Sequence, residues 1–423
     1  MKKLLFLIAI TIFFFIACTN EAIENQPIMK MHTRYISKDE ARKQVLDILN
    51  QSGFRTRSNG YFDGMNITSS FTRKYSYYIG NEEESCDMYI FNFGNNDGYA
   101  AMLSDSKTDQ LLVLTSEGKI EEDDPNIDIM FPPIVFDDTS EPDTIEHFDS
   151  ILVEPYVIDG PWFNVTIGYA PYSYVDFVEG NITRNFGLTK VRWHQDFPFN
   201  IYCPVTQLGN SPTGCVATAT AMLMSYYEHP TSYKGYTFNW SGMKTDPYAS
   251  HQDTTYTYQI ARLMRILGNS DNLHMNYGID ESGSNIKYVP ETLENLGYTS
   301  GGKVIYYDIN QIEFEITNNG PVIIQGKGDD GSGHAWVVDA ILKRIRELKY
   351  YSYTGKYLYS EYQTSYYLNC NWGIKLYMNN IGFYSSKYFD NTKTPEYDRN
   401  LNYNGYVPPY YKNELMMLYK VEK

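Results

Sequence analysis

The sequence predicts an α+β protein, because helical patterns come first in its C-terminal half and strand patterns follow them. Apolar residues recur with helical spacing up to Leu267, where Gly268 ends the pattern. Pro290 lies inside another such pattern, so that helix either begins there or is kinked. The predicted helices cover residues 216–227, 260–267 and 286–296, and the predicted strands cover residues 321–325, 334–340, 366–369 and 375–378.

The first residues read as an export signal. Two lysines precede an apolar run from Leu4 to Ala17, which is shorter than the roughly 20 residues that span a bilayer. The segment that ends in Cys18 resembles a bacterial lipobox, in which the cysteine becomes a lipidated N-terminal residue. The alternative is an ordinary secretory signal with a chance cysteine. We therefore expect a signal peptide over residues 1–17, a tether over 19–36 and a place in the bacterial envelope or outside the cell.

With 423 residues, the chain is expected to form two or more domains. Ser37 and Glu40 form a capping box before a helical pattern of apolar residues. Three strand patterns follow at residues 88–93, 99–103 and 110–115, which indicates a meander. These elements predict a small α+β domain over residues 37–120.

The segment after this domain is strongly acidic. Between Glu121 and Asp149 there are 11 acidic residues and neither Lys nor Arg, and four prolines interrupt any regular pattern. We interpret residues 121–180 as a linker or extended strap and residues 181–423 as the second domain. A proteolytic activation site is expected between about residues 160 and 190. The bonds after Arg184 and Lys190 are candidates if a basic-specific protease makes the cut.

Composition excludes several classes of function. The 35 basic residues against 51 acidic ones argue against nucleic acid as a partner. The five cysteines show no short even framework, so the chain is not a disulfide scaffold. Neither a Cys-x-x-Cys pair, a His-Glu-x-x-His motif nor a phosphate-binding Gly-Lys-Ser/Thr loop is present. The sequence therefore predicts no metal site, and catalysis without a cofactor.

Cys215 follows a glycine and starts an apolar helical pattern. A thiol at a helix N-terminus is expected to have a lowered pKa, because the peptide dipoles favour the thiolate. His334 opens a strand after glycines that let a substrate backbone come close, which suits a general base. The pair suggests a cysteine peptidase. The alternatives are a cysteine that only packs in the core and a base supplied by His194.

Several strings in register resemble the C10, or streptopain, family of papain-like cysteine peptidases. The resemblance covers about residues 185–385, and residues 37–115 resemble the family's propeptide more weakly. It implies a papain-like cysteine peptidase fold, in which a helical subdomain with the cysteine helix packs on an antiparallel sheet. It also implies a secreted zymogen whose prodomain inhibits it and whose substrates are proteins or peptides. The strings are residues 193–200, 214–221, 320–326, 333–339 and 371–373.

The resemblance implies a role for each matching residue. Cys215 is the nucleophile and His334 the base. Gln195 supplies a side-chain amide to the oxyanion hole. Trp372 covers the pair, and Asn371 is the candidate that orients the histidine ring.

The resemblance also implies substrate-contacting loops at Ser282, Gly283, Ser284 and Gly333, where small side chains let an extended peptide pair with the backbone. The alternative is two flexible turns. After Gly373 the chain departs from the family, which continues with a second tryptophan and glycines that shape the pocket wall.

Three hypotheses for the function follow. The first is an endopeptidase made as a zymogen and either anchored to the envelope or released. The second, motivated by the departure after Gly373, is a catalytically impaired surface-binding or inhibitor-like protein. The third is another papain-fold reaction, such as acyl transfer to an amine. Side-chain preference cannot be predicted, because the pocket is built from loops.

Overall fold

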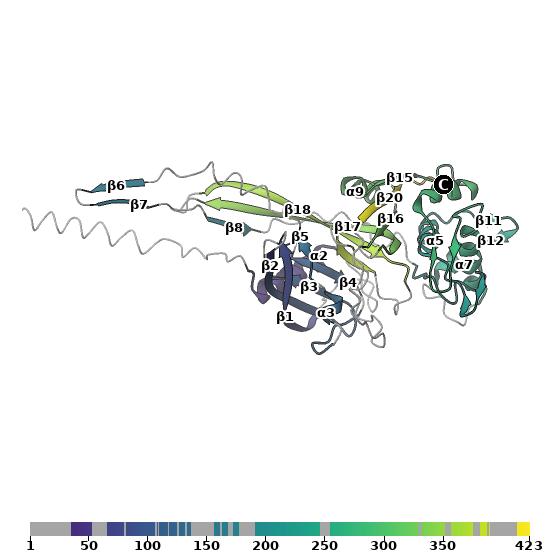
Figure 1. Ribbon diagram of the computed structural model, residues 1–423, viewed down its shortest axis with the longest axis horizontal. Helices are drawn as coiled ribbons and strands as arrows, with labels where there is room; N and C mark the ends of the chain where they lie inside the picture. Colours follow the sequence, from purple (N-terminus) through teal and green to yellow (C-terminus); the bar gives the residue numbers. More distant parts are fainter. Residues whose placement is uncertain are drawn as a thin grey trace, which may run out of the picture. The chain divides into compact units, whose positions relative to one another are not determined.

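This computed structural model describes most of the chain after residue 34, all of it in one unit, Tyr35–Lys423 (Figure 1). The predicted signal segment, Cys18 and most of the predicted tether lie outside the described residues. The described residues are 35–52, 66–79, 82–105, 108, 110–116, 118–124, 127–131, 133–136, 156–160, 163–167, 172–176, 191–245, 254–328, 331–351, 357–374, 381–386, 389 and 413–423.

The N-terminal domain begins with the predicted helix, α2 (Lys38–Ser52). The backbone N–H of Glu40 donates a hydrogen bond to the Ser37 hydroxyl over 3.2 Å, which confirms this half of the capping box. Ala41 and Val45, one helical turn apart, are buried against the sheet. The local cap and the apolar stripe together explain why the helix begins here.

The helix packs on an antiparallel sheet that contains the three predicted strands and one more. The additional strand was not predicted, although residues 67, 71, 75 and 77 alternate as buried side chains along it. Thr72, Lys74 and Ser76 lie between the last three of them on the opposite face. The strands are β1 (Ile67–Ile79), β2 (Glu82–Phe93), β3 (Tyr99–Leu103) and β4 (Leu111–Thr115).

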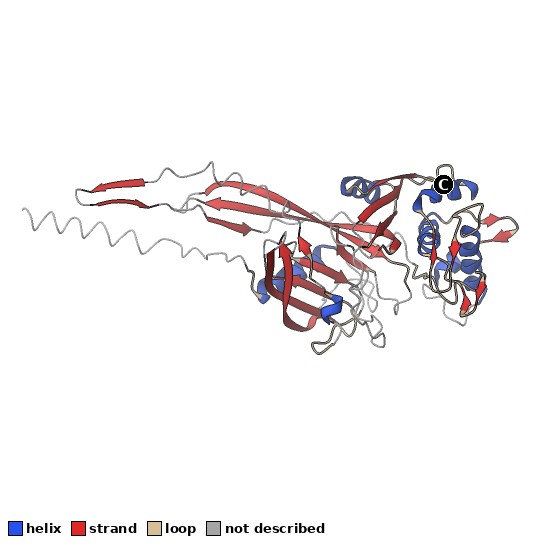
Figure 2. Cartoon of the chain, viewed as in Figure 1, coloured by secondary structure: helices blue, strands red, loops and turns tan. Residues whose placement is uncertain are grey.

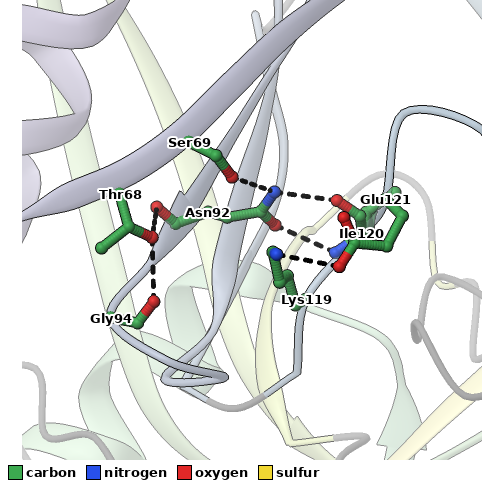
Figure 3. A network of polar contacts seen from close by, with 7 residues as sticks. All are labelled: Thr68, Ser69, Asn92, Gly94, Lys119, Ile120 and Glu121. Atoms are coloured by element: carbon green, nitrogen blue, oxygen red, sulfur yellow. Dashed lines mark hydrogen bonds and ion pairs between the residues drawn. The ribbon is translucent and has the colours of Figure 1, made fainter.

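The start of the predicted linker is packed onto this sheet, which corrects the prediction for its described residues 121–124, 127–131 and 133–136. Figure 3 shows the attachment, in which the buried Asn92 amide donates to the Ile120 carbonyl over 2.8 Å and accepts from the Ile120 N–H over 2.9 Å. A short helix follows, α3 (Ile127–Met130), with Ile127 and Met130 buried in the core. The strand β5 (Val135–Phe136) then pairs with β1.

The helices of the C-terminal half lie where the sequence predicts them, but their number is larger. Pro290 lies in the first turn of its helix, so the helix begins there and is not kinked. The helices are α5 (Cys215–Tyr227), α6 (Trp240–Thr245), α7 (Thr254–Leu267), the 3₁₀ turn η2 (Ile286–Tyr288), α8 (Val289–Asn295) and α9 (Ile309–Asn318), drawn in blue in Figure 2.

The predicted strands form an antiparallel sheet beside these helices, and two of them are much longer than predicted. The predicted strand at residues 375–378 lies outside the described residues. The strands are β15 (Lys303–Tyr306), β16 (Val322–Lys327), β17 (Gly333–Tyr351), β18 (Tyr357–Asn371), β19 (Gly382–Ser385) and β20 (Asn413–Tyr419), and β8 (Tyr172–Asp176) pairs with the far part of β17. The remaining strands are β6 (Tyr156–Gly160), β7 (Phe163–Ile167), β9 (Val205–Thr206), β10 (Gly209–Asn210), β11 (Ser232–Tyr233), β12 (Tyr236–Thr237), β13 (Asn276–Tyr277) and β14 (Ser282–Gly283).

The sheet of the N-terminal domain and the sheet of the C-terminal half form one continuous sheet. β19 pairs antiparallel with β4, with Phe383 opposite Leu114, so the ladder continues from the C-terminal half into the N-terminal domain. Phe383 also shares a buried apolar cluster with Ala41 and Val45 of α2. The protein is therefore an α+β protein whose N-terminal domain is joined to the second domain by backbone pairing and a common core. In the described part of the chain, no helix is both long and apolar enough to cross a membrane.

Candidate active site

Cys215 is the first residue of α5, and its position depends on the glycine before it. Gly214 has φ 88°, a backbone conformation that favours glycine. A Cβ on Gly214 would lie 2.6 Å from the Met275 sulfur and 2.9 Å from the Ser282 carbonyl oxygen. Thr218 closes the first helical turn by donating its N–H to the Gly214 carbonyl over 3.0 Å. The start of the helix is therefore pressed against β14.

Cys215 is half-buried, and its thiol lies among backbone N–H groups. Hydrogen bonds from the N–H groups of Ala335, Val216 and Cys215 itself lower its pKa, as the helix position predicts. Burial raises the pKa of the thiol and outweighs them. The predicted fall in pKa is therefore wrong for this state of the protein, in which the neutral thiol is favoured.

His334 is buried near the start of β17, and its ring is held by a backbone carbonyl. Its Nε2 lies 2.8 Å from the Trp372 carbonyl oxygen. Because that oxygen only accepts, Nε2 carries the proton and Nδ1 keeps a lone pair. Burial lowers the pKa of His334 to about 4, although the carbonyl contact acts in the opposite direction. The ring is therefore a neutral base in this structure.

The fold brings the predicted nucleophile and base to neighbouring positions from elements over a hundred residues apart in the chain. Ala335, whose N–H contacts the Cys215 thiol, directly follows His334. The His334 ring stacks with Trp336 and with Trp372 at centroid distances of 6.2 Å and interplanar angles of 13° and 28°. Trp372, the predicted cover of the pair, therefore lies against the histidine ring, and Trp336 is a second neighbour that was not predicted. A strand that alternates His334 and Trp336 places both on one face.

Asn371 is attached elsewhere. Its amide donates to the Val191 carbonyl over 2.9 Å, and its oxygen accepts from the Gly373 N–H over 3.4 Å. The oxygen that holds the His334 ring comes from the Trp372 backbone. Asn371 therefore supports the segment around Trp372 and ties it to Val191, near the start of the C-terminal half.

Gln195 and His194 lie in the loop before the cysteine helix. Gln195 is half-buried, and its backbone carbonyl accepts a hydrogen bond from the Thr213 N–H over 2.8 Å. This bond places Gln195 close to the beginning of α5. The ring of His194 packs edge-on against Phe199 at 4.8 Å and accepts from the Asp196 N–H over 3.3 Å. The loop itself thus accounts for the packing of His194.

The predicted substrate-contacting residues border the same region. Ser282 and Gly283 form β14, and the carbonyl of the next residue, Ser284, accepts from the Gln325 amide over 3.3 Å. A Cβ on Gly283 would meet nothing within 4 Å, and one on Gly333 would meet only a carbonyl oxygen at 3.9 Å. Both glycines therefore leave open space beside the backbone.

Gly373, where the departure from the family begins, packs on the cysteine helix. It has φ 64°, and a Cβ there would lie 2.9 Å from the Thr218 side chain. Residues 375–380 lie outside the described residues. The four described cysteines are unpaired, and among the described residues no three His, Cys, Asp or Glu side chains gather as metal ligands. The site consists of a thiol, an imidazole and backbone donors.

Comparison with known proteins identifies proteins that are similar to this chain. Residues 193–381 match the model of the Peptidase C10 family. Streptopain from Streptococcus pyogenes is 24% identical over 306 residues, covering 62% of this chain and 70% of its own. A prointerpain A fragment from Prevotella intermedia aligns with a TM-score of 0.45 at 20% identity, over 83% of this chain and 98% of the fragment. Active interpain A from the same organism aligns with a TM-score of 0.39 at 22% identity, over 55% and 92% of the two chains.

Proposed function

Because the chain carries a cysteine peptidase domain of the C10 family, we propose that Cys215 is its nucleophile and His334 its general base. One observation carries the assignment. The Trp372 carbonyl holds the Nε2 proton of His334, which leaves Nδ1 as the basic nitrogen, and the next residue donates its N–H to the Cys215 thiol. A lone core cysteine does not require such an arrangement.

Peptide hydrolysis follows from these roles. Nδ1 of His334 takes the thiol proton as the Cys215 sulfur bonds to the scissile carbonyl carbon. The imidazolium returns the proton to the leaving amine as the C–N bond breaks, and water then hydrolyses the thioester in the same manner. The N–H of Cys215 and the Gln195 amide would donate to the oxyanion, as the location of Gln195 beside α5 supports.

We infer that the N-terminal domain keeps the enzyme inactive until it is removed. It shares a strand ladder and an apolar core with the C-terminal half through β4 and β19. In this state the thiol and the imidazole are both neutral. Removal of the domain would change the burial of the sheet, and a more hydrated site favours the ion pair.

Substitution of the nucleophile tests the assignment. Cys215→Ala is expected to abolish cleavage of casein and of a fluorogenic peptide, whereas Cys203→Ala, which changes another unpaired cysteine, is expected to retain it. Iodoacetamide is expected to label Cys215 selectively after the N-terminal domain is removed. A Cys215→Ala protein that still cleaves casein would refute the mechanism.

The same labelling distinguishes the alternative, a catalytically impaired binding protein. The alternative is favoured by burial at the site, which shifts the pKa of each group towards its neutral form, and by the departure after Gly373. An inert Cys215 in the processed protein would support the binder. A labelled thiol that transfers an acyl group to an added amine, without hydrolysis, would instead support acyl transfer.

Export and lipid attachment are a separate part of the proposal. They are supported by the basic and apolar residues 1–17 and by the lipobox-like segment that ends in Cys18. Cells that express the protein are expected to retain it in the membrane fraction and to incorporate labelled fatty acid. Retention and labelling that persist in a Cys18→Ser variant would contradict attachment at this residue.

A further inference from the structure

The turn between β13 and β14 carries two adjacent carboxylates beside the cysteine helix. The turn is tight, since a Cβ on Gly278 would lie 2.4 Å from the Glu281 carbonyl oxygen. The Gly278 N–H donates to the Ser282 hydroxyl over 3.4 Å and closes it. Asp280 and Glu281 are both exposed at its end. The carboxylates are thus displayed on a short, anchored loop.

Of the two carboxylates, Glu281 directly precedes the residue that contacts the start of the cysteine helix. The next residue, Ser282, places its carbonyl against Gly214, directly before Cys215. Burial is the main cause that raises the pKa of the Cys215 thiol, and the charge of Glu281 adds a smaller effect in the same direction, because a negative charge nearby opposes formation of the thiolate. The contact between Ser282 and Gly214 and the effect of the Glu281 charge on the thiol both indicate that Glu281 lies at the border of the active site.

The described part of the chain supplies no countercharge to Glu281, which forms no ion pair with the lysines and arginines there. Cations of neighbouring segments have other partners. Arg265 lies over the Tyr277 ring at 5.5 Å and contacts Asn269, and Lys287 lies 5.1 Å from the centre of the Tyr288 ring. The carboxylate therefore remains available to a group from outside the protein.

An unpaired negative charge beside a thiol nucleophile is unfavourable for catalysis unless the substrate neutralises it. A lysine or arginine side chain of the substrate would pair with Glu281 and remove its opposition to the thiolate. Gly283 and Gly333 leave open space beside the backbone, and Gly283 lies in β14, which directly follows the turn. An extended peptide bound along β14 would therefore bring a side chain towards Glu281. Both binding and nucleophile activation then depend on the same positive charge.

We propose that Glu281 makes the enzyme select a lysine or arginine immediately on the acyl side of the scissile bond. The inference rests on the proposed function, since it names the substrate class of the same site. Within the expected activation region, residues 160–190, the chain contains two bonds of this class, after Arg184 and after Lys190. The preference therefore suits cleavage of the enzyme's own precursor.

The test compares processed enzyme on peptides that differ only at the acyl-side residue, which is Lys, Arg, Gln or Glu. The ratio of kcat/KM for the Lys and Gln peptides is expected to be about fivefold, the effect of one partly exposed charge pair. The ratio is expected to fall to about one in Glu281→Gln and, through screening, in about 1 M salt. Asp280→Asn removes the adjacent charge as a matched control and is expected to keep the preference.

A second measurement does not depend on turnover. The pH midpoint of Cys215 alkylation is expected to move to lower pH in Glu281→Gln and to change less in Asp280→Asn. An unchanged Lys-to-Gln ratio in Glu281→Gln, or an equal loss in Asp280→Asn, would overturn the inference. If the enzyme cleaves all four peptides equally, only the inference fails. If it cleaves none of them and no casein, the proposed function fails as well.

Discussion

His334 is expected to make the stability of the protein depend on pH. Burial lowers the pKa of His334 to about 4 in the folded protein from its usual 6.5. The unfolded chain therefore binds a proton more readily than the folded one, and acid favours unfolding. The part of the unfolding free energy that depends on a neutral His334 is fully present above about pH 6.5 and is lost as the pH falls towards 4. A difference of about 2.5 pKa units, at about 1.4 kcal/mol each, corresponds to about 3.5 kcal/mol, of which about 3 kcal/mol is lost between pH 7 and pH 4.

The assay is urea unfolding at pH 7 and pH 4, followed by tryptophan fluorescence, in a Cys215→Ala background that prevents autolysis. His334→Gln is the informative change, because its amide can still donate to the Trp372 carbonyl but does not titrate. Between pH 7 and pH 4, the unfolding free energy of the parent is expected to fall by about 3 kcal/mol more than that of this variant. His274→Gln changes an exposed histidine and serves as the control. Equal losses in the parent and in His334→Gln would refute the argument.

Two further substitutions test the geometry around the site. Gly214→Ala is expected to lower the unfolding free energy by at least about 1 kcal/mol and to reduce kcat, because the residue has φ 88° and no room for a Cβ. The control is Gly235→Ala, because Gly235 has φ 86° but open space around it, so this variant has the backbone strain without the clash. If calorimetry gives equal losses of unfolding free energy for the two variants, the clash at Gly214 is contradicted. Asn371→Leu removes the hydrogen bonds with Val191 and Gly373 and is expected to lower the unfolding free energy by about 1–3 kcal/mol. Its kcat is expected to fall with little change in KM, and an unaltered kcat would exclude a positioning role.

Much of the secondary structure was predictable because it depends on neighbouring residues. The hydroxyl of Ser37 caps a helix three residues away, and Pro290 fits only the first turn of its helix. The interpretation of residues 121–180 as a linker or extended strap came from acidic composition, and it was wrong for the described residues at its start. Ile127, Met130 and Phe131 have the i, i+3, i+4 spacing of a buried helical face, so a signal was present there. The continuation of the sheet from β4 to β19 had no such signal, because strand pairing joins segments that are far apart in the chain.

The sequence by itself determined that Cys215 begins a helix, that His334 opens a strand, and that both belong to a recognisable peptidase pattern. Only the tertiary structure decided what surrounds them. The carbonyl that holds the histidine ring and the charge of Glu281 act through space. The direction of the Cys215 pKa was also decided there. Helix position is a local property that lowers it, whereas burial depends on every element packed around the thiol, and in this fold burial has the larger effect.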